Sequence, residues 1–159
     1  LWDRNFYTPT VGGRALLAAR IGDDPVAALI ERELADYGVD CRHLRRFAGC
    51  ASSLSAVMVD GEGERMIVNY LDPALPADPA WLPGARAAGC DAVLADTRWP
   101  EGARAALQAA SDAGLPAVLD ADRPIPADGA LLASASHVAF SHEALAEYAA
   151  EPDPVRALE

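Results

Sequence analysis

The stretch "CDAVLADTRWPEGARAALQAASDAG", residues 90–114, decides the fold of this chain. Its apolar run at 91–95 predicts a buried strand, and the alanine-rich run at 101–113 predicts a helix. Arg98 and Trp99 stand where the strand ends. Because ligands of α/β proteins bind beyond the carboxyl ends of the strands, Arg98 is either a surface residue or a ligand for an anion.

The same alternation continues toward the end of the chain. Strands are predicted at 116–120 and 136–140, and helices at 127–135 and from residue 142 onward. Strands that alternate with helices at this spacing imply right-handed crossovers and a parallel sheet with helices on its faces. The chain is therefore predicted to be an α/β protein.

The residues before this stretch begin with a further strand and helix. A strand is predicted at 14–21 and an amphipathic helix at 25–38. Asp24 suits the N-cap of that helix and Pro25 its first position, and Gly38 suits the residue that closes it. The turn "GDD" at 22–24 could also offer two carboxylates to a metal, but capping is the favoured interpretation.

Between these two parts the pattern changes to that of a hairpin. "SSLSAVMVDGEGERMIVNY" (52–70) holds two runs rich in β-branched residues around the turn 60–63. Its first arm alternates so that one face is apolar and the other is partly exposed. Four prolines in 71–84 indicate an ordered connection.

Charge and composition exclude several functions. Of 159 residues 24 are acidic, the net charge is −11, and all 13 basic residues are arginine, so no basic stripe is present to bind a nucleic acid. No apolar run is long enough to cross a bilayer and no signal peptide is recognised. Cys41, Cys50 and Cys90 show neither metal nor disulfide spacing. We expect a cytoplasmic protein with no membrane partner.

The common catalytic motifs are missing from these 159 residues. Neither a phosphate-binding loop of the Gly-x-x-x-x-Gly-Lys-Ser/Thr type nor a Gly-x-Gly-x-x-Gly fingerprint occurs. Serines 52, 53 and 55 fall in a predicted strand and not on a nucleophile elbow. Histidines 43, 137 and 142 lack the spacing of zinc ligands.

Polar residues nevertheless gather at the predicted strand ends. Asp120 and Asp122 end the strand at 116–120 and should face the same crevice as Arg98. A carboxylate there could orient a hydroxyl or a metal-bound water, or it could simply bind its own backbone.

Arg98 also has two interpretations. Its guanidinium is a planar fork that suits carboxylate, phosphate or sulfonate oxygens, or it could form an exposed ion pair with Asp96 or Glu101, which is worth little. Asn69, at the end of the second arm of the hairpin, could donate to the same anion or could be a turn residue.

The order of these features resembles the PfkB, or ribokinase-like, family of sugar kinases. The resemblance rests on a strand that leads to "GDD", a helix, "GVD" at 38–40, the hairpin, and the α/β alternation up to the helix after Phe140. It implies a doubly wound, mostly parallel sheet with helices on both faces and a small β lid at about 43–70. Residues 1–159 would be part of one such domain, its N-terminal half to two-thirds.

Within this family the chain is most similar to the sulfofructose kinases, on "SSLSAVMVDGEGERMIVNY", "VLADTRW" and "VLDAD". That similarity implies that Arg98 and Asn69 contact the sulfonate of the substrate. The resemblance also implies that Asp3 binds sugar hydroxyls and that the enzyme uses ATP and Mg²⁺. Asp120 and Asp122 are further candidates because of their place at the strand end. A homodimer formed through the β lid is expected.

The chain departs from the family pattern in three places. The segment between Tyr7 and Gly12 is shorter than in relatives. Where the family has an Asn-x-x-Glu motif that arranges magnesium, "SHEA" (141–144) places Glu143 one position out of step, so that the alternative for Glu143 is a helix-start acid favoured by the helix dipole. The Gly-Ala-Gly-Asp motif, which supplies the catalytic base, is expected beyond Glu159.

Two alternatives remain open beside an anionic-sugar kinase. In the first, the enzyme phosphorylates a neutral sugar or a nucleoside, such as ribose, fructose or adenosine, and Arg98 is structural. In the second, the chain is a non-catalytic module for sugar binding or dimerisation.

Overall fold

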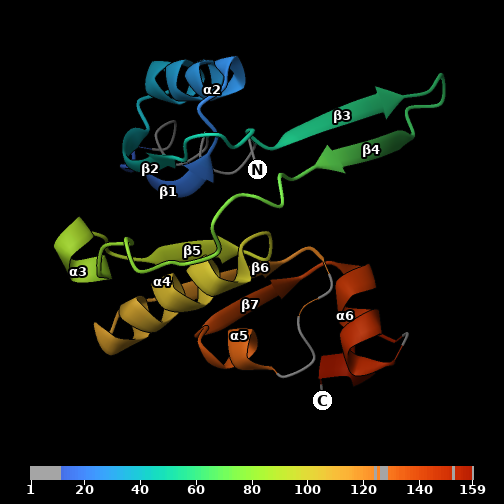
Figure 1. Cartoon of the computed structure of the whole chain (residues 1–159). Coiled ribbons are helices and arrows are strands. Elements are labelled where there is room, and N and C mark those ends of the chain that lie inside the picture. Colours follow the sequence, from blue (N-terminus) through green and yellow to red (C-terminus); the bar gives the residue numbers. More distant parts are fainter. Residues whose placement is uncertain (1–11, 124, 126–128, 152, 159) are drawn as a thin grey trace. The chain divides into compact units, whose positions relative to one another are not determined.

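The computed structural model describes residues 12–123, 125, 129–151 and 153–158 (Figure 1). The chain divides into two compact units, unit 1 at Leu1–Pro76 and unit 2 at Ala77–Glu159. The expected departure between Tyr7 and Gly12 lies almost wholly outside the described residues. Among the described residues no helix is long and apolar enough to cross a bilayer.

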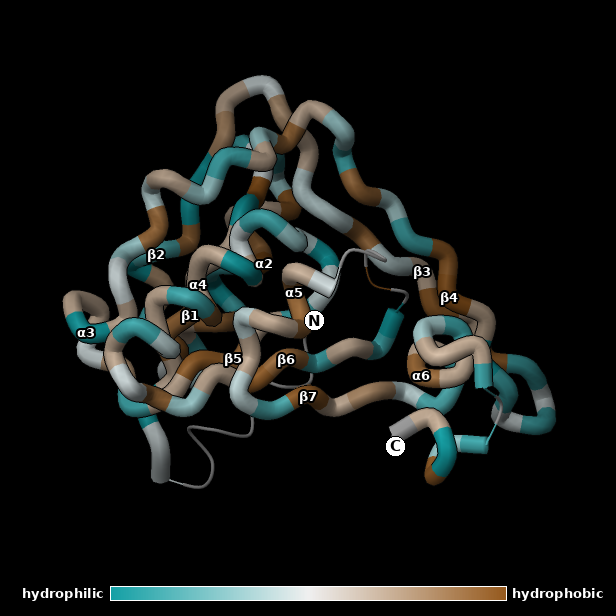
Figure 2. The backbone as a smooth tube through the Cα atoms, turned by 90° about the horizontal axis from the view of Figure 1, so that it is seen from below, coloured by the Kyte–Doolittle hydropathy of each residue, from teal (hydrophilic) through white to brown (hydrophobic). Residues whose placement is uncertain are grey.

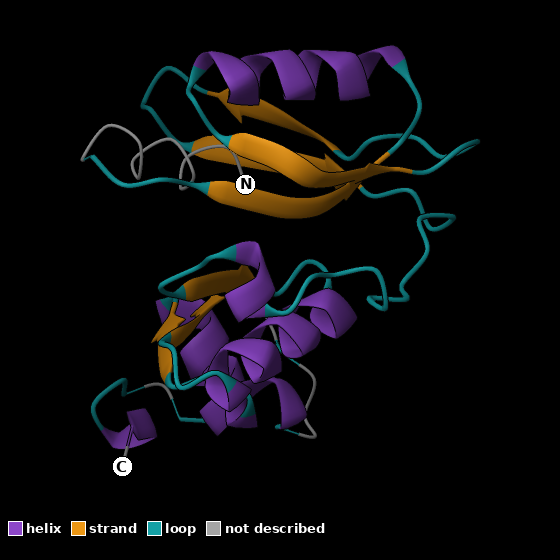
Figure 3. Cartoon of the chain, turned by 90° about the vertical axis from the view of Figure 1, so that its left-hand side faces the viewer, coloured by secondary structure: helices purple, strands orange, loops and turns teal. Residues whose placement is uncertain are grey.

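Unit 1 is built on β1 (Leu16–Ile21), α2 (Pro25–Asp36) and β2 (Asp40–Arg46). β1 and β2 pair in parallel, and α2 lies along one face of these strands (Figure 3). Buried Leu34 of α2 packs with Val39 and Ala15 in a small apolar cluster. The sequence predicted β1 and α2 but not β2, which takes residues 43–46 of the predicted lid region.

The start of α2 agrees with the sequence prediction. The Asp24 carboxylate accepts the Ala27 amide proton at 2.9 Å, so Asp24 is the N-cap, and Pro25 occupies the first turn. Gly38 has a φ of 73°, the left-handed conformation that glycine adopts at little cost after a helix. The capping interpretation of "GDD" is confirmed for Asp24.

The predicted hairpin is formed by β3 (Leu54–Val59) and β4 (Arg65–Tyr70), which pair antiparallel. The Asp60 carboxylate closes the turn by accepting the amide protons of Glu62 and Glu64. Every residue of both strands is exposed, so the hairpin packs neither face against the rest of unit 1. The sequence predicted one apolar and one partly exposed face for the first arm, and in this chain both faces are exposed.

Unit 2 contains the predicted parallel sheet, in the order β5–β6–β7. β5 covers Val93–Asp96, β6 Ala117–Ala121 and β7 His137–Phe140. Figure 2 shows that much of β6 and β7 is hydrophobic. The helices of this unit are α3 (Ala85–Ala88), α4 (Pro100–Asp112), α5 (Ala130–Ala133) and α6 (His142–Ala149), followed by the 3-10 turn η1 (Arg156–Leu158).

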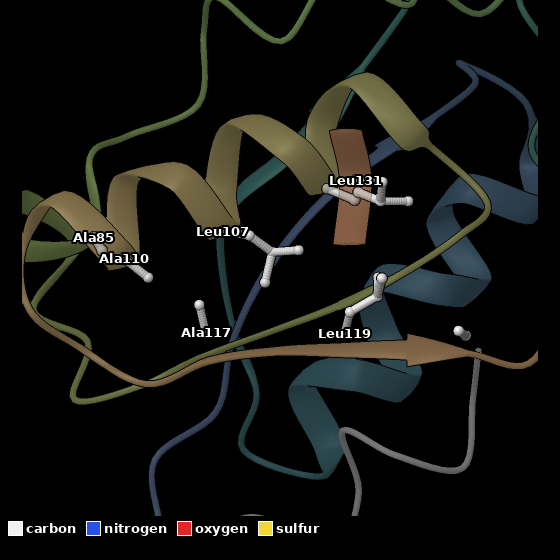
Figure 4. Packing of buried hydrophobic residues seen from close by; sticks show 8 residues of the cluster. Ala85, Leu107, Ala110, Ala117, Leu119 and Leu131 are labelled. Carbon is white, nitrogen blue, oxygen red and sulfur yellow. The ribbon is translucent and has the colours of Figure 1, made fainter. Parts of the chain in front are cut away.

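The core of unit 2 lies between α4 and the sheet (Figure 4). Leu107 of α4 and Leu119 of β6 are both fully buried, and alanines of α4 and β6 fill the space around them. The predicted helix at 127–135 is shorter in the structure, since α5 has four residues and 126–128 lie outside the described residues. The alternation of strands and helices is confirmed.

Candidate functional site

Three of the predicted site residues gather at one edge of the unit 2 sheet. Asp96, the last residue of β5, lies in register with Asp120 of β6. Arg98 follows β5 and Asp122 follows β6, so both come to the same carboxyl edge. Together with Thr97, these residues form what we term the strand-end cluster. The sequence prediction that Asp120, Asp122 and Arg98 end neighbouring parallel strands is consistent with this arrangement.

The Arg98 side chain lies between two carboxylates. Its Nη2 is 3.4 Å from an oxygen of Asp122 and its Nε is 4.0 Å from an oxygen of Asp96. The Arg98 amide also donates to Asp96 at 2.9 Å, and Thr97 Oγ1 donates to Asp122 at 3.5 Å. Charge-assisted bonds of full strength are about 2.7–2.9 Å long, so the guanidinium contacts are loose.

Arg98 therefore keeps some capacity to bind a ligand. Its side chain is 30% exposed. A guanidinium has five N–H donors, and the described carboxylates contact it through Nε and Nη2. The predicted pairing with Asp96 is present, while the pairing with Asp122, 24 residues away in sequence, was not predicted.

Trp99 fixes the backbone beside Arg98. Its ring stacks on Trp81 with centroids 5.5 Å apart, and its Nε1 donates to the Ala77 carbonyl at 2.8 Å. The ring also lies against Gly102, where a Cβ atom would lie 2.3 Å from the indole carbons. Trp99 is half-buried and does not belong to the fully buried core.

Alanine at Gly102 is expected to displace the Trp99 indole, because a Cβ cannot occupy a position 2.3 Å from the ring. The loss should be about 1–3 kcal/mol in the free energy of unfolding, the usual cost of overpacking. Trp99 should lose its stack on Trp81, which tryptophan fluorescence and near-ultraviolet circular dichroism would report. Gly84→Ala is the control, since nothing lies within 4 Å of a Cβ there. Unchanged tryptophan spectra in Gly102→Ala would contradict this expectation.

Asn69 lies on β4 opposite Ser55 of β3. The Ser55 hydroxyl donates to Asn69 Oδ1 at 2.6 Å, so the carbonyl end of the amide is held. The side chain is exposed, and its Nδ2 is a donor that a ligand can reach. Asn69 belongs to unit 1 and Arg98 to unit 2, so the meeting of the two at one anion stays a prediction.

Glu143 lies in the first turn of α6 and is exposed. Ser141, and not Glu143, caps the helix by accepting the Ala144 amide proton at 3.1 Å. Within the described part of the chain no group of three or more His, Cys, Asp or Glu side chains could hold a metal ion. One carboxylate does not make a magnesium site, and the role of Glu143 stays a prediction. Asp3 lies outside the described residues.

The structure also shows a polar network that the sequence did not predict. Ser52 is 1% exposed, and its Oγ accepts the Gly22 amide proton at 3.0 Å and donates to Asp24 at 2.8 Å. Asp24 also accepts the Ser52 amide proton at 2.8 Å. The amides of Ser52 and Ala27 lower the pKa of Asp24 below its ordinary value of 3.8. Ser52 precedes β3, so its assignment to a strand was wrong.

A comparison with protein families assigns the chain to one of them. Residues 8–158 match the profile described as "pfkB family carbohydrate kinase". The chain belongs to the pfkB family. Membership in this family confirms the predicted resemblance at family level, and the predicted nearness to sulfofructose kinases stays a prediction.

Solved structures of similar proteins agree with pfkB membership. A provisionally assigned ribokinase from Agrobacterium tumefaciens is 33% identical to this chain, with a TM-score of 0.87. The match covers 97% of this chain and 52% of that one. The fold is shared with a fructokinase with bound ATP from Xylella fastidiosa (21% identity, TM-score 0.80, 97% of this chain and 53% of that one). It is also shared with an Arabidopsis thaliana ribokinase complexed with ribose and ATP (20% identity, TM-score 0.75, the same coverage). The chain thus spans about half the length of these structures.

The predicted ribokinase-like α/β class is confirmed by these neighbours. Among the described residues, the strand-end cluster and the exposed hairpin both present polar groups to solvent. The cluster offers carboxylates that accept from hydroxyls and a guanidinium that donates to an anion, and the hairpin offers the Asn69 amide.

Proposed function

We propose that the protein containing this chain is an ATP-dependent sugar kinase that transfers the γ-phosphoryl group to a hydroxyl of a ketose-like sugar in the cytoplasm. The match of residues 8–158 to the pfkB family supports this proposal. Similar proteins include a ribokinase complexed with ribose and ATP and a fructokinase with bound ATP. Phosphoryl transfer also needs charge stabilisation, which Mg²⁺ ordinarily supplies beside ATP. The catalytic base and the nucleotide pocket would lie beyond Glu159.

This chain would supply the sugar-binding side of the site. Asp3 would bind sugar hydroxyls, and Arg98 and Asn69 would bind an anionic substituent such as a sulfonate. The observation that carries this proposal is the position of Arg98, which is partly exposed at the carboxyl end of β5 and has loose contacts to its two carboxylates. A ligand oxyanion at about 2.8 Å would make stronger bonds to the fork than these carboxylates do.

The same contacts favour a second candidate, a kinase for a neutral sugar or nucleoside. Asp96 and Asp122 compensate the charge of Arg98, which weakens its attraction for a further anion. Asp120 stands at the same edge and adds a third carboxylate. Carboxylates accept hydrogen bonds from hydroxyls, so Asp120 and Asp122 would then bind a neutral sugar and Arg98 would hold Asp122 in position.

Replacement of Arg98 by alanine separates the two candidates. On the full-length protein, ADP release should be measured with sulfofructose, fructose, ribose and adenosine. If the substrate is anionic, Arg98→Ala should lower kcat/KM for sulfofructose by about 10–100-fold, the scale of a lost hydrogen bond to a charged group. The weaker activity on neutral sugars should change little.

The control for this panel is Arg104→Ala, which removes an exposed arginine of α4 and should leave all four activities unchanged. A wild-type protein that turns over fructose, ribose or adenosine as well as sulfofructose would favour the neutral-sugar candidate. If the full-length protein released no ADP with any of the four, the non-catalytic sugar-binding or dimerisation module would be the better proposal.

The hairpin β3–β4 would be the lid of this enzyme. Its strands expose large apolar residues on both faces, such as Met58, Val59, Met66 and Val68, all at least half exposed. One apolar face of the lid would cover the sugar and exclude water from it. The other apolar face would pair with the lid of a second subunit in a homodimer.

A further inference from the structure

The direction of the hairpin is not set by packing. All twelve residues of β3 and β4 are exposed, so no side chain of either strand is buried against the rest of unit 1. A two-stranded ribbon of this kind takes its direction from the points where the chain leaves and rejoins the body of the protein. We term these points the hairpin base, residues 50–52 and 72–76.

Two carboxylates hold the incoming side of the hairpin base. The amide of Ala51 donates to Asp72 Oδ2 at 2.6 Å, and the amide of Ser52 donates to Asp24 Oδ2 at 2.8 Å. These are consecutive amides, and their acceptors come from different parts of the chain: Asp24 caps α2, and Asp72 follows β4 by two residues. Charged acceptors make the stronger class of hydrogen bond.

The outgoing side is held by the same carboxylate and by β1. Asp72 Oδ1 accepts the Ala74 amide proton at 2.9 Å, so each oxygen of Asp72 serves one side of the base. Arg20 of β1 donates to the Pro76 carbonyl at 2.9 Å. The amides of Ala51 and Ala74 lower the pKa of Asp72 below its ordinary value of 3.8.

We propose that Asp24 and Asp72 are positioning residues that clamp the hairpin base, so that the hairpin approaches the sugar from one fixed direction. This inference rests on the proposed function, in which the hairpin covers the sugar. Neither aspartate need touch the substrate. Each acts through the backbone of Ala51 and Ser52, from which β3 starts two residues later.

Asp72→Asn tests this clamp in the full-length protein. Ala51 and Ala74 donate to different oxygens of Asp72, and an asparagine places an NH₂ donor where one of these oxygens stands, so one of the two bonds is lost. KM for the sugar should rise about tenfold, the scale of one lost hydrogen bond to a charged group. The kcat and the KM for ATP should stay within about twofold of wild type, because the reacting atoms are not touched.

The matched control is Asp78→Asn in the same connection. Asp78 uses a single oxygen, Oδ1, to accept the Ala80 amide proton at 3.0 Å, and asparagine retains that acceptor. Its KM values should equal those of wild type. If Asp72→Asn does not fold, Asp72→Glu, which moves the carboxylate by one methylene, replaces it in the comparison.

Hydrogen exchange gives a second readout that needs no kinase activity. In Asp72→Asn, the paired amides of residues 54–70 should exchange about tenfold faster, while those of α4 should be unchanged. If the wild-type protein phosphorylates no sugar, the proposed function fails, yet this measurement still reports on the clamp. Exchange at the wild-type rate in 54–70 would overturn the clamp, and faster exchange with an unchanged sugar KM would overturn its role in positioning.

Discussion

Gly22→Ala is expected to lower the free energy of unfolding of unit 1 by about 3 kcal/mol, at the upper end of the usual cost of overpacking. A Cβ at this position would lie 2.2 Å from the Cys50 carbonyl oxygen and 2.7 Å from backbone atoms of Ala51 and Ser52. All three neighbours are backbone, so no side chain can rotate away to make room. The chain itself has to move.

The bonds that would break are those that join the end of β1 to the hairpin base. The Gly22 amide donates to Ser52 Oγ, and the Asp23 amide donates to the Cys50 carbonyl at 3.2 Å. Urea denaturation of the full-length protein would measure the loss, and limited proteolysis near residues 50–54 would locate it.

Gly61→Ala is the matched control for Gly22→Ala. Gly61 lies in the turn of the hairpin, no atom lies within 4 Å of a Cβ there, and its φ is outside the left-handed region. Alanine there should be neutral or slightly stabilising, because it restricts the unfolded chain. A Gly22→Ala protein that is as stable as Gly61→Ala would show that the backbone at 50–52 yields easily, against the close packing described here.

Local patterns in the sequence were enough to predict most elements of both units. The apolar runs that became β5, β6 and β7 and the caps of α2 depend on residues within a few positions of each other. β2 was missed because "DCRHLRR" has five polar or charged residues in seven and pairs with β1, more than twenty residues earlier. Pairing between distant segments leaves no local signal.

The candidate site was predictable to a similar extent. The ends of parallel strands meet at one edge, so Arg98, Asp120 and Asp122 could be grouped from the strand prediction alone. The pairing of Arg98 with Asp122 depends on rotamers at that edge, and the bonds from Ser52 to Asp24 join residues 28 apart. The small polar run around Ser52 was the available signal, but a buried serine and a strand serine look alike in sequence.

Leu107→Ala is expected to cost about 2–5 kcal/mol of unfolding free energy, the range for a fully buried leucine in a close-packed core. Leu107 is 0% exposed and is one of the largest side chains that this chain buries completely. It belongs to the buried cluster between α4 and the sheet, which includes alanines such as Ala110 and Ala117 that are too short to fill the cavity (Figure 4). The melting temperature should fall by roughly 5–15 °C.

The matched control is Leu29→Ala, because Leu29 also lies within a long helix but is 42% exposed. The same atoms are removed there, the lost burial is smaller and no cavity is left, so the loss should stay below about 1 kcal/mol. Differential scanning calorimetry of both variants of the full-length protein would give the comparison. Equal melting temperatures for the two variants would mean that the neighbours of Leu107 collapse into the space it leaves, and that the α4–sheet contact does not determine the stability of unit 2.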